Sequence, residues 1–490
     1  MKLKTKLTTI TICLALIFFL LAAQSGGVKA ATNVTNLNDS GPGSLRQAIA
    51  DGAPGDTITF AVTGTITLTS GELVIGKDLT LSGPGAASLA LSGNLLSRVI
   101  NTSSHLTISG LTIRNGEAGA GAGGGILNTG SGVLTITNSV ITANRAQRGG
   151  GVFNNPGGTL HVTNSTFSAN FTRLVDVGLD ASGAGIYNAA PGGVVSISNS
   201  TFSSNLVHDH GSGLYNDATA TVANSTFSLG QAKTAAIYNN SGSLQLNNVT
   251  ITLNSGQKDA TGLLSAGGSV SLANSIIAEN HTVGGGNNNS LPDCGGTLTS
   301  GGHNLIGNAT GCGISAGTGD LLGSNVAPIN PKLGPLTING GPTLTHTLLA
   351  GSPAIDAGSP AAPGSGGSAC EATDQRGDVR PFLGATSLTC DIGAVELGAS
   401  GLLASNSSPT LLGQVTTFTP SGLAAGFTYH WDFGDGVTSN VNPATHTYAA
   451  AGHYLATVTA TNGVVSLIAT TQVTVLNVPG FHIFLPTVLK

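Results

Sequence analysis

Side chains that could carry acid–base chemistry are few, and most of them gather in two neighbouring stretches of the chain. These residues are the carboxylates Asp176, Asp180 and Asp209 and the basic side chains Arg173, His208 and His210. Carboxylates that converge beside a basic group can cleave a glycosidic bond, so the aspartates are catalytic candidates and the basic residues are ligand-binding candidates. A solvated loop would carry the same charges. We assign no metal site and no cofactor; Ca²⁺ stays open as an alternative that no motif of the sequence supports.

Three tyrosines, Tyr187, Tyr215 and Tyr238, recur within the similar segments GAGIYN, GSGLYN and AAIYNN. Each follows an apolar residue expected to point inward, so strand alternation predicts an outward ring. With Phe153, at the same place in GGGVFN, they would form a ladder of exposed rings. Aromatic faces complement the C–H groups of sugars, so the tyrosines are further ligand-binding candidates. The alternative is that a neighbouring loop buries the rings.

Four cysteines lie beyond the first 30 residues and fall into two local pairs. No CxxC motif is present, and the spacings do not match zinc sites. Export from the cell favours oxidation, and of the three possible pairings, proximity in the sequence favours Cys294–Cys312 and Cys370–Cys390.

An internal repeat must position these residues. A short motif that begins with asparagine recurs about every 25 residues, apart from one insertion near residues 174–182. The asparagines are Asn138, Asn164, Asn199, Asn224, Asn248 and Asn274. Apolar and polar residues alternate before each one, as in Leu134-Thr135-Ile136, which predicts a strand. Strands repeated at this interval without helices between them predict a parallel β-solenoid.

Stacking of equivalent residues on successive coils explains the scarcity of charge. Neighbouring strands lie about 4.8 Å apart, so a repeated charge would repel itself, whereas Asn, Ser, Thr and Val can stack. We expect the amides of the asparagine column to bond to one another and to turn backbone. We expect a second column to be an interior stack: Ile141, Phe167, Phe202, Phe227, Ile251 and Ile277. The charges should gather on one loop ridge along the solenoid.

Composition excludes several classes of protein. Only 8% of the 490 residues are charged, 73 are glycine, and the net charge is −5. Such a chain is too apolar to be disordered, and its acidic balance argues against a nucleic-acid partner. Residues 1–30 predict a signal peptide, because lysines precede an apolar stretch that ends in Val28-Lys29-Ala30. We expect a secreted or cell-surface monomer with no transmembrane segment in the mature chain.

Longer motifs carry a resemblance to known families. The segment GSLRQAIADGAPGDTITF, with the GAGIYN and NSTF repeats, resembles secreted bacterial right-handed β-helix proteins, which include the pectin-lyase-like superfamily and polymorphic outer-membrane-protein repeats. The stretch Asp293–Glu396, with DQRGDVRP and CDIGAVE, resembles the choice-of-anchor Q region. The resemblance implies a right-handed parallel β-helix. Lyases and hydrolases of these families cluster acidic residues on one exposed face.

A second resemblance covers the C-terminal part. YHWDFGDG, THTY and AGHYLATVTATN resemble a PKD domain, an immunoglobulin-like β-sandwich in which Trp431 would anchor the core. The predicted fold class is therefore all-β, a right-handed parallel β-helix solenoid followed by this sandwich. The predicted divisions are a signal peptide (1–30), a β-helix with an N-terminal cap (31–292), final coils with a disulfide-stapled cap (293–397), a linker (398–409), the PKD-like domain (410–476) and a tail (477–490). The tail is interpreted as a sorting signal or a last edge strand.

Two functions remain open at the level of sequence. The first is a secreted or surface-displayed structural or adhesion-type protein, which binds polysaccharide or other cell-surface components through a face of the β-helix. The second is a polysaccharide lyase or glycoside hydrolase that acts on an acidic polysaccharide. They differ in whether Asp176, Asp180 and Asp209 converge to within about 6 Å.

Overall fold

The computed structural model describes residues 31–174, 180–282, 292–349, 351–381, 389–397, 402–421, 427–461 and 466–476. The expected signal peptide, Asp176 and the expected tail lie outside these ranges, so the predictions about them remain predictions. The described chain is nearly all-β and has one helix, α2 (Leu45–Asp51). At seven residues this helix falls well short of the roughly 20 needed to cross a bilayer.

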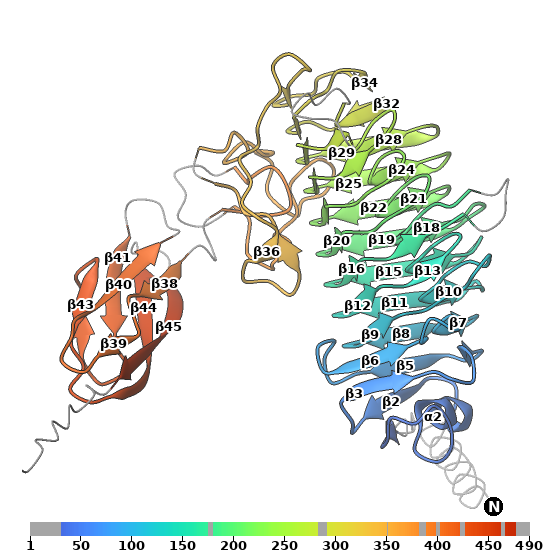
Figure 1. The fold of residues 1–490 in the computed structure, drawn as a ribbon. Helices are drawn as coiled ribbons and strands as arrows, with labels where there is room; N and C mark the ends of the chain where they lie inside the picture. Colours follow the sequence, from blue (N-terminus) through green and yellow to red (C-terminus); the bar gives the residue numbers. More distant parts are fainter. Residues whose placement is uncertain are drawn as a thin grey trace, which may run out of the picture.

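The described residues between 31 and 322 wind as a parallel solenoid, and most coils contribute one short strand to each of three faces (Figure 1). One coil consists of β10 (Ile126–Asn128), β11 (Val133–Thr137) and β12 (Val140–Thr142). In β11 the apolar residues Leu134 and Ile136 are buried, while Thr135 between them is partly exposed. The strands of successive coils pair in parallel and in register. Equivalent residues of the sequence repeat are therefore neighbours in space.

The three faces are named here by their order in the coil. Face 1 consists of β4 (Leu73–Ile75), β7 (Ile100–Thr102), β10, β14 (Val152–Asn154), β18 (Ile186–Asn188), β21 (Leu214–Asn216), β24 (Ile237–Asn239), β28 (Leu263–Ser265), β32 (Cys294–Ser300) and β34 (Cys312–Ile314). Face 2, in front in Figure 1, consists of β1 (Ala31–Val34), β2 (Asp56–Phe60), β5 (Leu79–Ser82), β8 (Leu106–Ser109), β11, β15 (Thr159–Thr163), β19 (Val194–Ser198), β22 (Thr219–Ala223), β25 (Ser243–Asn247) and β29 (Ser269–Ala273). Face 3 consists of β3 (Gly64–Thr67), β6 (Leu89–Ser92), β9 (Thr112–Arg114), β12, β16 (Thr166–Ser168), β20 (Thr201–Ser203), β23 (Thr226–Ser228), β26 (Thr250–Thr252), β30 (Ile276–Ala278), β33 (Leu305–Ile306) and β35 (Leu321–Leu322).

The predicted interior stack is confirmed. All six of its side chains are buried on the inner side of face 3. The rings of Phe167, Phe202 and Phe227 stack with centroids 4.8 and 4.5 Å apart. These distances match the spacing of the coils, so each ring covers the next without a gap.

The asparagine column that begins at Asn138 does not form the predicted ladder of amides. Its residues occupy the corner between faces 2 and 3 with left-handed backbone, at φ of 42–51°. Asparagine tolerates this conformation, so the corner selects it for its backbone. Amide ladders form instead within two other columns of asparagines. In each, the side-chain amides of successive coils bond to one another at N···O distances of 2.7–3.1 Å. The columns are Asn128, Asn154, Asn188, Asn216 and Asn239 at the ends of face 1 strands, and Asn144, Asn170 and Asn205 after face 3.

Helix α2 lies at the N-terminal end of the solenoid, where the first coil would otherwise leave its interior open (Figure 1). Leu45, Ala48 and Ile49 of the helix are buried and join the solenoid core. The hydroxyl of Ser44 accepts a hydrogen bond from the Gln47 N–H at 3.2 Å and caps the helix.

The described residues between 334 and 397 form the C-terminal cap, which folds back along the outer side of face 3 (Figure 1). It includes β36 (Thr337–Ile338) and β37 (Leu344–Thr345). Thr226 of β23 donates to Gln375 of the cap at 2.6 Å, and Ala394 N–H donates to Thr250 at 3.0 Å. The covered strand β23 is buried at all three positions, whereas Thr166 of β16 remains partly exposed.

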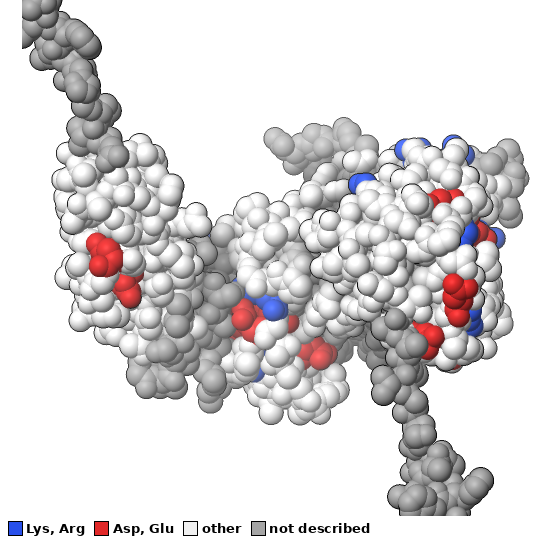
Figure 2. Space-filling view, turned by 90° about the horizontal axis from the view of Figure 1, so that it is seen from below, with Lys and Arg blue, Asp and Glu red and all other residues white. Residues whose placement is uncertain are grey.

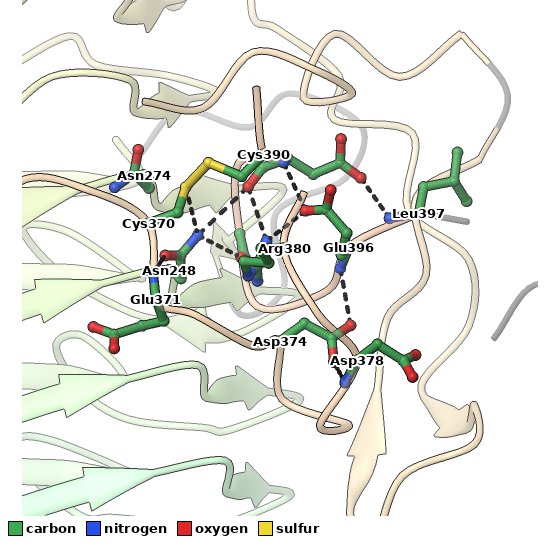
Figure 3. Close-up of polar contacts among 12 residues, drawn as sticks. Asn248, Asn274, Cys370, Glu371, Asp374, Asp378, Arg380, Cys390, Glu396 and Leu397 are labelled. Carbon is green, nitrogen blue, oxygen red and sulfur yellow. Dashed lines mark hydrogen bonds and ion pairs between the residues drawn. A yellow bond between two sulfur atoms is a disulfide. The ribbon is translucent and has the colours of Figure 1, made fainter. Parts of the chain in front are cut away.

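A buried polar network holds the cap together (Figure 3). Arg380 and Glu396 form an ion pair of 3.0 Å, and both side chains are inaccessible to solvent or nearly so. Asn248, a corner residue of the solenoid, accepts a hydrogen bond from Glu371 N–H at 2.9 Å. Both predicted disulfides are present: Cys370–Cys390 within the cap and Cys294–Cys312 in the last coils.

The C-terminal region is a β-sandwich with its own core. One sheet consists of β38 (Leu403–Asn406), β40 (Thr416–Ser421) and β43 (Ala444–His446). The other consists of β39 (Thr410–Leu411), β45 (Ser466–Leu476), β44 (Gly452–Thr461), β41 (Thr428–Asp432) and β42 (Thr438–Ser439). Trp431 is fully buried between the sheets, as predicted. The predicted linker, residues 398–409, contains strand β38. Because Leu403–Asn406 pairs with β40, this part of the stretch belongs to the sandwich.

Candidate functional site

The loops that lead from face 3 to face 1 of the next coil stack in parallel and form the predicted ridge. Their short strands β13 (Arg145–Ala146) and β17 (Phe171–Thr172) pair in parallel, as do β27 (Ser255–Gly256) and β31 (His281–Thr282). Seen from below, towards the N-terminal end of the solenoid, the visible Lys, Arg, Asp and Glu side chains form a few small groups on a surface that is otherwise almost uncharged (Figure 2). Arg173 lies 3.6 Å from Glu117 in one of the ion pairs of this ridge.

The ridge carboxylates have different surroundings. Asp209 accepts a hydrogen bond from Ala181 N–H at 2.9 Å and lies 3.2 Å from His208. Partial burial acts to raise the pKa of Asp209, but these hydrogen bonds hold the pKa below its ordinary value. Asp180 is half-buried, and its Oδ2 has no hydrogen-bond partner among the described residues. Asp209 therefore fastens the inserted loop to the next coil, while Asp176 lies outside the described residues.

His210 and His208 differ although only one residue separates them. The side chain of His208 is about half exposed, whereas His210 stacks on Tyr238 with ring centroids 4.4 Å apart. The Nδ1 of His210 lies 2.6 Å from the hydroxyl of Thr234. Burial lowers the pKa of His210, so this ring is uncharged at pH 7. The ridge thus reaches the aromatic ladder of face 1.

The aromatic ladder forms, but its rings are not exposed as expected. The centroids of Phe153, Tyr187, Tyr215 and Tyr238 follow one another at 4.9, 4.5 and 5.4 Å. Only 5% of Tyr187 and 6% of Tyr215 is accessible to solvent, and Tyr238 is half-buried. Coils about 4.8 Å apart leave no gap between stacked rings, so each ring covers the face of the next. A ligand can meet the edges and hydroxyls of the ladder, but cannot insert between its rings.

A residue of the predicted ridge that was not among the ligand-binding candidates covers the start of the ladder. The guanidinium carbon of Arg148 lies 5.5 Å from the centroid of Phe153 and 5.8 Å from that of Tyr187. Arg148 is half-buried, and its guanidinium has no ion pair or hydrogen bond with another described residue. Its N–H groups therefore remain available to a ligand.

Arg148 and the ladder border a cavity of about 510 Å³ on the outer side of face 1. Its lining includes Phe153, Asn155, Tyr187 and Asp217. The Tyr187 hydroxyl donates to Asp217 at 3.0 Å. Burial, followed by the nearby carboxylates, raises the pKa of Tyr187, so the hydroxyl stays protonated. One cation, one carboxylate, an amide and a phenol thus surround a cavity with an aromatic floor. Across the described ranges, no three His, Cys, Asp or Glu side chains are grouped to hold a metal ion.

Comparisons with protein families identify two parts of the chain. Residues 98–283 match the family model of a right handed beta helix region, and residues 395–475 match that of the PKD domain. The chain combines a parallel β-solenoid, part of which matches the right-handed β-helix model, with a PKD domain. No curated protein matches the chain. The ridge, the ladder and the cavity all lie within the matched β-helix, while the likeness of 293–397 to the choice-of-anchor Q region stays a prediction.

The sequence contains a signal for Arg148 that the prediction did not use. Arg148 and His210 both immediately precede the glycine that opens the next face 1 segment, at Gly149 and Gly211. On their coils of the β-helix, both side chains then pack against aromatic rings. Asp217 directly follows the asparagine of GSGLYN. Its place at the cavity became evident only from its hydrogen bond with Tyr187 of the preceding coil.

Proposed function

We propose that this protein is an extracellular adhesion-type protein that binds acidic glycans at the cavity beside Arg148. The observation that carries the proposal is the half-buried Arg148 guanidinium, which lies over two aromatic rings and has its N–H groups unpaired among the described residues. A guanidinium binds a carboxylate through two parallel hydrogen bonds. A uronate or another carboxylated sugar meets this requirement.

The other lining groups suit the rest of a sugar. The amide of Asn155 and the carboxylate of Asp217 offer hydrogen bonds to hydroxyl groups, and Ala122 and Leu127 give the cavity an apolar wall. Small-molecule sites combine such apolar walls with a few polar groups that fix orientation. A cavity of about 510 Å³ accommodates a short segment of glycan.

Two features support a location outside the cell. Both cysteine pairs are oxidised, and disulfides persist in oxidising compartments. The PKD match and the β-helix match also fit an extracellular adhesion or carbohydrate-related protein. The catalytic alternative needs Asp209 to be free for chemistry, whereas its carboxylate accepts a hydrogen bond from Ala181 N–H of the inserted loop.

The test measures the affinity of the full chain for oligogalacturonate and oligoalginate by calorimetric titration, with neutral oligosaccharides as the comparison. Arg148→Gln removes the cation and should weaken the binding of acidic oligosaccharide about tenfold to one-hundredfold, which corresponds to one charge-assisted hydrogen-bonded contact. The matched control is Arg145→Gln, because Arg145 is exposed on the same coil.

Equal affinity of Arg148→Gln and the wild type, or no affinity for any acidic sugar, would contradict the proposal. Release of unsaturated products from pectate or alginate, abolished by Asp209→Asn, would favour the lyase alternative instead.

A further inference from the structure

Face 2 carries a column of neutral polar side chains that runs along the solenoid. Parallel registers link nine residues, one from each successive coil, at the central outward position of the strand. The hydroxyl column, as we name it, consists of Thr57, Thr80, Thr107, Thr135, His161, Ser196, Thr221, Gln245 and Ser271. Adjacent members are about 4.8 Å apart because they belong to neighbouring strands. Lys, Arg, Asp and Glu are absent from all nine positions.

None of these nine side chains forms a hydrogen bond with another described residue of the chain. All nine are partly or fully exposed, since the alternation of the strand turns them away from the core. The amide ladders at Asn154 and Asn170 show the opposite behaviour, because their polar atoms are buried and paired. The hydroxyl column therefore has donors and acceptors that the fold does not use.

The column runs into a groove between face 2 and the cap. A cavity of about 570 Å³ lies there, with Ser196, Thr221, Gln245 and Ser271 on its floor. Residues 364–371 of the cap form its wall, and the carboxylate of Glu371 accepts a hydrogen bond from Asn247 at 2.8 Å. Among the described residues that line this groove, Glu371 is the only charged one. Its negative charge disfavours an acidic polymer.

We propose that the hydroxyl column and this groove bind an extended neutral polysaccharide, which lies along the solenoid axis and across the strands. Repeated hydroxyl and amide groups at a regular spacing can bond to the repeated hydroxyls of such a chain. The spacing of about 4.8 Å is comparable to the length of one pyranose unit in an extended chain. This site lies on a different face from the cavity at Arg148 and is independent of it.

The experiment measures binding of the full chain to neutral polymers, with barley β-glucan, galactomannan and cellulose as probes and polygalacturonate as the acidic comparison. The triple variant Thr107→Val, Thr135→Val and Thr221→Val removes three hydroxyls at constant shape, with no loss of internal hydrogen bonds. Affinity for one or more neutral polymers should fall at least tenfold. The matched control is Thr166→Val, a partly exposed threonine on face 3 outside the cap.

A second triple variant, with serine at the same three positions, retains the hydroxyls and should bind as the wild type does. Binding of polygalacturonate should be unchanged in both triple variants, and binding of neutral polymers should be unchanged in Arg148→Gln, so the two sites are tested separately. Wild-type affinity of the valine variant, or no binding of the wild type to any neutral polymer, would overturn the proposal.

Discussion

Asparagine serves two separate purposes in this solenoid, and the distinction appears only at the scale of single residues. Asn138 uses its backbone, since it holds a left-handed corner at φ 48° and is exposed. Asn154 uses its side chain, since its buried amide accepts from Asn128 at 2.8 Å and donates to Asn188 at 2.9 Å. Substitution should therefore destabilise the fold to different extents in the two columns.

We expect Asn154→Ala to lower the free energy of unfolding by roughly 3 kcal/mol, because it removes an acceptor of the Asn128 amide and leaves the buried Asn188 Oδ1 without its donor. Asn138→Gly should change it by less than about 0.5 kcal/mol, because glycine adopts the left-handed conformation freely. Urea denaturation followed by circular dichroism measures both values. A larger loss for Asn138→Gly than for Asn154→Ala would show that the two roles are assigned the wrong way round.

At the scale of elements, the cap depends on charges that are buried together. Arg380 pairs with Glu396 at 3.0 Å and also donates to Gly393 O at 2.8 Å (Figure 3). Removal of one member of a buried ion pair leaves the other charge uncompensated, whereas replacement of both by apolar residues is often tolerated. The pair thus stabilises the cap chiefly because any opening that separates the two side chains would leave a buried charge uncompensated.

Glu396→Gln should destabilise the cap by about 3–5 kcal/mol and increase hydrogen exchange in residues 389–397. Exchange in the first coils of the solenoid should not change, since the described residues of those coils form no hydrogen bond with the described residues of the cap. The double variant Arg380→Met, Glu396→Leu should recover much of the loss. Glu371→Gln is the control, because Glu371 is a partly exposed carboxylate of the same cap. Equal exchange in Glu396→Gln and the wild type would contradict this account.

At the scale of the whole molecule, the solenoid and the sandwich have separate hydrophobic cores. The solenoid core runs from Val34 to Ile306, and the sandwich core contains Trp431 and Phe418. No residue belongs to both cores among those described. The two parts should therefore unfold independently.

Trp431→Ala should unfold the sandwich alone. Truncation of a buried tryptophan costs about 3–5 kcal/mol, which is a large share of the stability of a small domain. In differential scanning calorimetry of the full chain, one transition should shift down or disappear while the other keeps its midpoint. Val441→Ala, at a position that is 65% exposed, should leave both transitions in place. A single transition that shifts as a whole would show that the two parts are coupled.

Much of the fold and part of the candidate site were predictable, because the motifs of the sequence repeat and equivalent residues stack on successive coils. The recurring motifs place Phe167 beside Phe202 and Tyr187 beside Tyr215, because parallel coils keep equivalent residues in register. The burial of the tyrosine ladder was not predictable in the same way, since it depends on how closely the rings of successive coils cover one another. The role of Arg148 also depended on a contact with Tyr187, which belongs to the next coil.

The sequence by itself determined the solenoid, the ridge, the sandwich and both disulfide pairs, because each depends on a local pattern or on a repeat that stacking preserves. Only the tertiary structure decided where the cap lies, since the bond from Thr226 to Gln375 joins residues 149 positions apart. The same fold decided which threonines became free hydroxyls. Thr226 is buried beneath the cap and paired, while Thr221, five residues earlier, faces the groove with its hydroxyl unpaired among the described residues. Both residues are threonines, so it is their packing in the tertiary structure that makes the hydroxyl of Thr226 a buried donor and leaves that of Thr221 open to the groove.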